Sequence, residues 1–99
     1  AGALEAEALL ASFDALGVPD YAATRRDLLE VLERRREQLA PETFALVMAN
    51  LELIEESMAR IATALGADPG NELLQRQLVT AYRRQVDLLE RAARLPSRV

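Results

Sequence analysis

The chain has 99 residues, of which 51% are hydrophobic and 4% aromatic. This length permits one domain with a modest core, and the abundance of Leu and Ala favours a helical bundle. The formal net charge is −4, with acidic and basic residues interleaved along the chain, so nucleic-acid binding is not expected. There is no Cys and no His, and no apolar run approaches the roughly 20 residues of a membrane span. We therefore expect no disulfide, no metal site and no membrane insertion, and the amino end lacks the pattern of an intact signal peptide.

Two shorter helices are predicted first, over residues 3–16 and 20–39. Gly17 suits the end of the first helix, because glycine tolerates the left-handed cap and Pro19 cannot continue the same hydrogen-bond ladder. Asp20 is placed to cap the second helix. Their apolar faces are formed by Leu4, Ala8, Leu9, Phe13 and Leu16, then by Tyr21, Leu28, Leu32 and Leu39.

A longer helix is predicted over residues 41–66. Pro41 fits its first turn, where the missing N–H is no loss, and Glu42 suits the positive end of the helix dipole. Apolar residues then alternate at three- and four-residue spacing, as in the seam of a coiled coil. Gly66 is expected to end this helix, and the segment 68–71 (Asp-Pro-Gly-Asn) predicts a turn in which Asn71 caps the next helix.

The last predicted helix covers residues 72–94, and Pro96 stops it. The short turn before it predicts an antiparallel hairpin with the 41–66 helix. The expected fold is therefore all-α, a single domain over residues 1–99, in which the two shorter helices pack on an elongated hairpin. We assign the working contacts of the hairpin, including a homodimer contact, to an interaction seam: Phe44, Val47, Leu51, Ile54, Met58, Ile61, Leu74, Leu78, Tyr82, Gln85 and Leu89.

Two charged clusters are candidate binding sites. Glu52, Glu55 and Glu56 resemble the carboxylates of metal-binding bundles, but without His they are better explained as a solvated face, with Glu56 paired to Arg60. The run 34–36 (Arg-Arg-Arg) fits either a clamp for an anionic ligand or a helix exterior interleaved with Glu, and the second is favoured. Arg83 and Arg84 beside Tyr82 repeat this pattern.

Two polar residues interrupt the apolar pattern of the hairpin. Asn50 lies beside the seam and Gln85 lies within it, and either can fix the helix register through a buried hydrogen bond. Nucleophilic catalysis requires a base beside Ser or Thr, and the chain has neither His nor Lys to serve as one. We therefore expect neither an enzyme nor a cofactor.

The segment 39–95 contains a characteristic order of capping and packing residues: 39–43 (Leu-Ala-Pro-Glu-Thr), Asn50, Leu51, Ile54, Ala64, Leu65, 68–71, Leu74, Leu78, 82–84 (Tyr-Arg-Arg), Leu88 and Leu89. This order resembles the helical region that follows the membrane span in bacterial zinc-finger anti-sigma-factor-like proteins. The resemblance implies an extracytoplasmic, periplasmic-side part of a membrane-tethered regulator that signals to transcription through protein contacts. Because Cys, His and a span are lacking, no zinc ligand or sigma-factor contact can be transferred, and Ala40 replaces the expected capping Ser before Pro41.

The turn chemistry around residues 64–82 is also similar to that of tetratricopeptide repeats, although the 41–66 helix is about twice as long and no 34-residue period is found. Two functions follow as hypotheses. The first is a regulatory or sensory domain of an anti-sigma-factor-like protein, and the alternative is a free-standing helical adaptor or dimerisation module, which would be cytoplasmic. Both predict a protein partner.

Overall fold

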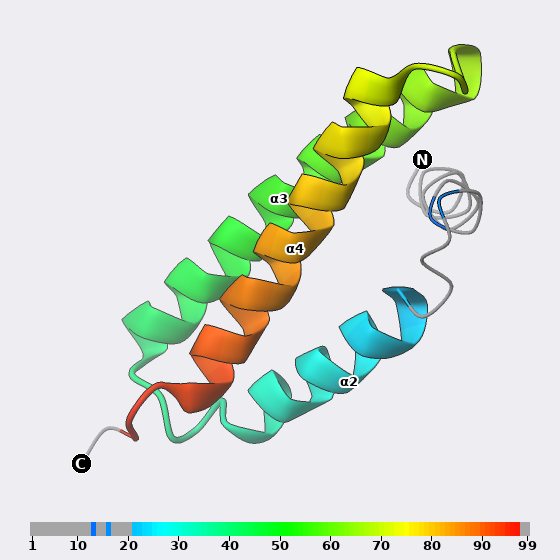
Figure 1. Cartoon of the computed structure of the whole chain (residues 1–99). Helices are drawn as coiled ribbons and strands as arrows, with labels where there is room; N and C mark the ends of the chain where they lie inside the picture. The colour runs from blue at the N-terminus through cyan, green and yellow to red at the C-terminus, as the bar shows by residue number, and fades with distance from the viewer. Residues whose placement is uncertain (1–12, 14–15, 17–20, 98–99) are drawn as a thin grey trace.

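The structure is a computed structural model and describes residue 13, residue 16 and residues 21–97. These residues form three α-helices and no strand: α2 (Tyr21–Arg34), α3 (Pro41–Ala67) and α4 (Glu72–Arg94) (Figure 1). The all-α prediction is confirmed for this part of the chain. The prediction of four helices is wrong, because only three are found among the described residues. None of these three has the length and hydrophobicity of a transmembrane span.

The predicted helix over residues 3–16 lies outside the described residues, except for Phe13 and Leu16. Phe13 is in helical conformation and only 1% exposed, and Leu16 packs against the same core cluster. The two apolar positions that can be assessed therefore contribute to the core, as their spacing predicts.

The second helix ends earlier than the sequence predicts, at Arg34 instead of residue 39. Tight turns follow it: the backbone N–H of Gln38 donates to the Arg35 carbonyl at 2.9 Å. Pro41 disfavours helical conformation in the residue before it, and Ala40 is extended with ψ 139°. The early end allows the chain to reverse and brings Leu39, 2% exposed, into the core.

The hairpin helices follow the predicted boundaries closely. Helix α3 begins at Pro41 without a side-chain cap and continues to Ala67, one residue beyond the prediction, because the Asp68 N–H donates back to the carbonyls of Ala64 and Leu65. Helix α4 covers the predicted range, and the Asn71 side chain accepts a hydrogen bond from the Leu74 N–H at 3.1 Å. The predicted N-cap is thus confirmed.

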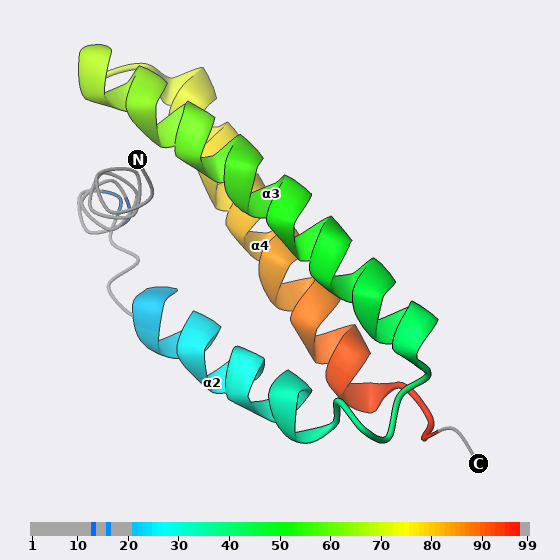
Figure 2. The same cartoon turned by 180° about the vertical axis from the view of Figure 1, so that it is seen from behind.

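Helices α3 and α4 lie side by side in antiparallel orientation, and α2 packs against α4 (Figures 1 and 2). The molecule is elongated, with principal extents of 50 × 23 × 22 Å. In Figure 2 α3 lies in front of α4, and no described element covers the side of α3 that faces the viewer.

The core is divided into two clusters along the hairpin. The first cluster contains Phe13, Tyr21 and the half of the hairpin next to its 68–71 turn, and the second contains Leu39 and the half near the carboxyl end of the chain. Gln85 lies between them along α4 and is 1% exposed. The buried members are Phe13, Tyr21, Met58, Ala62, Leu65, Leu78 and Ala81 in the first cluster, and Leu32, Leu39, Val47, Leu51, Leu89 and Ala92 in the second.

Candidate interaction surface

The predicted interaction seam is used inside the chain. Val47, Leu51, Met58, Leu78 and Leu89 are buried core residues, and Gln85 is buried with them. The other five seam residues are partly buried and pack against the two clusters: Phe44, Ile54, Ile61, Leu74 and Tyr82. Contact between α3 and α4, together with α2, therefore occupies these side chains, and a partner that bound them would have to open the core.

The arginine cluster has a structural role that the sequence does not reveal. The Arg35 guanidinium donates to the carbonyls of Ala92 and Ala93 at 3.1 and 2.8 Å, so it caps the last turn of α4. Arg36 lies 5.0 Å from the centre of the Phe44 ring and pairs with Glu33 at 3.1 Å. Such contacts satisfy helix-end carbonyls and place positive charge at the negative end of the dipole. Arg35 is thus committed to packing, whereas Arg34 and Arg36 are exposed.

The acidic cluster on α3 is divided between two environments. Glu55 forms an ion pair with Arg25, which ties α3 to α2, whereas Glu52 and Glu56 are exposed. The predicted ion pair between Glu56 and Arg60 is not formed. No group of three potential metal ligands occurs in the described part of the chain.

A polar layer separates the two core clusters. The Gln85 amide and the Tyr21 hydroxyl are buried without a hydrogen bond of good geometry among the described residues. The Tyr21 ring stacks on Phe13 at 4.4 Å between centroids and meets Tyr82 edge-on at 5.3 Å. Of the two candidate register residues, Gln85 is the buried one and Asn50 is exposed.

Burial of Tyr21 changes its acidity. Removal of the hydroxyl from water raises the pKa of Tyr21 above its ordinary value, and the nearby Glu55 adds to this rise, while Gln85 and Arg25 oppose it. A hydrogen bond to Glu55 raises the pKa of Arg25. Both rises in pKa favour the protonated form, which is the neutral phenol for Tyr21 and the charged guanidinium for Arg25.

The two most exposed apolar side chains of α3 lie on the side of the helix away from the core residues, whereas Met48, 37% exposed, lies beside α2. Leu46 and Leu53 are each 63% exposed, and Ala49 between them is exposed as well. The two leucines are seven positions apart, so they project from nearly the same angle of the helix. A single exposed Leu is ordinary, but two on one stripe with Ala between them form an apolar surface.

Charged residues continue this surface at both ends. From Glu42 to Arg60 the residues of this surface are four, three, four, three and four positions apart, which is the a/d pattern of a second coiled-coil seam. Neither Glu42 nor Arg60 has an ion-pair partner among residues 21–97. We call these residues the outer stripe: Glu42, Leu46, Ala49, Leu53, Glu56 and Arg60.

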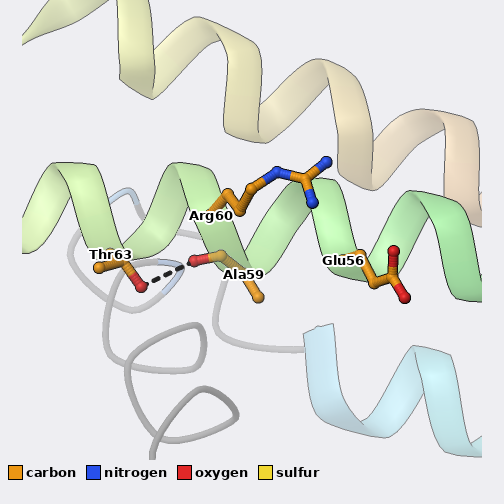
Figure 3. A pocket seen from close by; sticks show the side chains of 4 residues that line it. All are labelled: Glu56, Ala59, Arg60 and Thr63. Carbon is orange, nitrogen blue, oxygen red and sulfur yellow. Dashed lines mark hydrogen bonds between the residues drawn. The ribbon is translucent and has the colours of Figure 1, made fainter.

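A hollow of about 290 Å³ lies at the carboxyl end of the outer stripe, and its lining side chains are drawn in Figure 3. It is lined by Glu56, Ala59, Arg60 and Thr63, and the Thr63 hydroxyl donates to the Ala59 carbonyl at 3.0 Å. The lining residues that the structure describes all belong to α3, and two of them, Glu56 and Arg60, belong to the outer stripe.

A second hollow, of about 430 Å³, lies between α2 and α3. Its apolar lining is Leu29, Leu32 and Met48, and its charged residues carry both signs, so they favour no anionic or cationic ligand in particular. The charged members are Arg25, Arg26, Glu30 and Glu33.

Heptad spacing did not predict the outer stripe. Leu46 and Leu53 lie outside the first heptad pattern, which is formed by other apolar residues of this helix. The seven-residue step from Leu46 to Leu53 and on to Arg60 was the available signal. Whether Leu46 and Leu53 are exposed depends on which of the two apolar faces packs against α4, and periodicity alone does not specify this face.

Comparisons with known protein families, with curated proteins and with solved structures found no match to this chain. The resemblance to anti-sigma-factor-like proteins therefore stays a prediction from the residues that carry it.

Proposed function

We propose that this chain is a non-catalytic helical domain for protein interaction, and that the outer stripe of α3 is its contact surface. The supporting observation is that α3 is apolar on two sides. One side is buried against α4 and the core, while the other leaves Leu46 and Leu53 each 63% exposed.

The energetics favour a helical partner. Burying a Leu side chain contributes roughly 1.5–3 kcal/mol, so two leucines and the intervening Ala provide a substantial part of the free energy of a specific contact. A helix that is hydrophobic all round is normally covered on all sides. The a/d spacing of the outer stripe suits an amphipathic helix that packs along α3.

The hairpin holds this surface in a fixed conformation. Pro41 starts α3, Asn71 caps α4, and Arg35 bonds the carbonyls at the end of α4. A preformed helix loses little conformational entropy on binding, which favours affinity at a modest interface area.

Site-specific photocrosslinking tests this function. A photoreactive amino acid replaces Leu46 or Leu53 in the full-length protein, which is expressed in its own cells. The control carries the same replacement at Leu73, which is 57% exposed on α4 and not on the outer stripe. We expect protein adducts of discrete mass from the α3 positions and none from Leu73. Equal yields at all three positions, or no adducts, would contradict the proposed function.

For the setting of this contact we infer, from the resemblance of residues 39–95, the extracytoplasmic helical region of an anti-sigma-factor-like regulator. Deletion of residues 41–95 from the native protein should then change the output of its target genes. Unchanged output, with the truncated protein present at normal abundance, would favour the alternative of a free-standing adaptor.

A further inference from the structure

We propose that the partner on the outer stripe is a second copy of this chain. The α3 helices of the two copies pack antiparallel, and the twofold axis crosses the outer stripe at the level of residue 51 along the helix. This inference rests on the proposed function, because it names the occupant of the same surface. It assigns each residue of the outer stripe a facing residue in the second copy.

The outer stripe is complementary to itself in antiparallel orientation. In a twofold contact each pairing occurs twice, and in an antiparallel coiled coil each a position faces a d position. The register that pairs Ala49 with Leu53 of the second copy places a small side chain against a large one. The same register pairs Glu42 with Arg60 of the second copy at both ends.

Charge selects this orientation over the parallel one. Parallel packing would place Glu42 against Glu42 and Arg60 against Arg60, and such like-charge contacts oppose association. Antiparallel packing converts all of these contacts into opposite-charge pairs. Within residues 21–97 neither Glu42 nor Arg60 forms an ion pair.

The remaining position of the stripe is compatible with this register. Leu46 faces Glu56 of the second copy, where the methylene groups of Glu56 can cover the leucine while its carboxylate reaches water, as long charged side chains do at helix contacts. Glu56 forms no ion pair within the described residues and is exposed, so this arrangement requires no bond to be broken.

Charge-reversal variants test the register. Glu42→Arg alone and Arg60→Glu alone each create two like-charge contacts per dimer, so each dissociation constant should rise roughly tenfold in sedimentation equilibrium. An equimolar mixture of the two variants restores opposite charges at both ends of the mixed dimer. Its dissociation constant should return to within about threefold of the original protein. Rescue by mixing controls for folding, because the mixture contains the same two variants.

Disulfide crosslinking is an independent test of the register, because the chain has no native Cys that would form other disulfides. We expect Ala49→Cys mixed with Leu53→Cys to crosslink about tenfold faster than either variant alone, because facing positions have a high effective concentration. Faster crosslinking of each variant with itself would indicate parallel packing and overturn the proposal.

A monomeric mass for the original protein at high micromolar concentration would also overturn this proposal. Discrete photoadducts with a different protein at Leu46 and Leu53, together with that monomeric mass, would leave the proposed function intact and refute the second copy. Absence of both adducts and self-association would refute the two together.

Discussion

Arg35 shows how one side chain of a charged run acquires a specific role. It lies between two similar residues in sequence, yet its guanidinium alone donates to the carbonyls of Ala92 and Ala93. Arg34 is exposed at the end of α2. The difference arises because the chain turns directly after Arg34 and directs Arg35 towards the end of α4.

Arg35→Ala should lower the free energy of unfolding by about 1.5–3 kcal/mol, because the hydrogen bonds from a charged donor to the carbonyls at the end of α4 are lost. Arg34→Ala is the matched control and should change it by less than about 0.5 kcal/mol. Urea denaturation followed by circular dichroism measures both values. Equal effects of the two substitutions would contradict the capping role.

Tyr21 makes stability depend on alkaline pH. Its pKa is raised in the folded state above the ordinary value of 10.0, mainly by burial. As pH rises through 10 the unfolded chain loses this proton first, so the unfolded state is favoured and stability falls until the folded pKa is reached. Titrations of the original protein and of Tyr21→Phe, by thermal unfolding from pH 8 to pH 11, measure this loss.

The variant isolates the contribution of one of the two tyrosines, and the chain contains no Lys and no Cys that would titrate in the same range. Tyr21→Phe should lose much less stability over this pH range. It also removes a buried hydroxyl that lacks a well-formed hydrogen bond, so its stability at neutral pH should not fall substantially. Parallel losses in the two proteins would show that Tyr21 is not the responsible group.

Helix α3 has two apolar sides, one that stabilises the core and one that is exposed to solvent. Leu51 is 2% exposed in the second core cluster, whereas Leu53, two positions later, is 63% exposed on the outer stripe. Because the two positions point in different directions around the helix axis, Leu51 stabilises the core and Leu53 is available to a partner.

Leu51→Ala should lower the free energy of unfolding by about 2–5 kcal/mol, the usual cost of a cavity in a packed core. Leu53→Ala, the same change in the same helix, should cost less than about 0.5 kcal/mol in the monomer. Chemical denaturation at low protein concentration distinguishes them. A large effect of Leu53→Ala in the dilute monomer would mean that this side chain is part of the intramolecular core.

The whole molecule is built on a long hairpin, whose residues pack into two core clusters on either side of a polar layer. The molecule measures 50 × 23 × 22 Å. Side-by-side association would therefore increase mainly its thickness, and end-to-end association would increase mainly its length. An antiparallel dimer through the outer stripe would place the second molecule alongside the first and not end to end.

Small-angle X-ray scattering over a concentration series should therefore show the mass doubling while the maximum dimension grows by well under half. Association through the hairpin turn or the chain ends would instead nearly double the maximum dimension. The Leu46→Asp/Leu53→Asp variant should keep the monomer dimensions at every concentration, because buried carboxylates disfavour the contact.

Local patterns in the sequence determined the hairpin. Pro41, the turn at residues 68–71, Asn71 and Pro96 act through nearest-neighbour geometry, so the limits of α4 were predicted correctly and those of α3 to within one residue. The heptad spacing likewise identified the buried side of α3. The prediction of four helices was wrong, and the predicted end of the second helix was too late because Ala40 must extend before Pro41 while Leu39 enters the core.

Only the tertiary structure decided which side chains are available to a partner. Sequence periodicity shows that a helix has apolar faces, but exposure depends on which neighbour covers each face. Packing of α4 and α2 buried the seam that we had assigned to interaction and left Leu46 and Leu53 exposed. It likewise gave Arg35 its carbonyl partners and buried Gln85, since both depend on contacts between residues far apart along the chain.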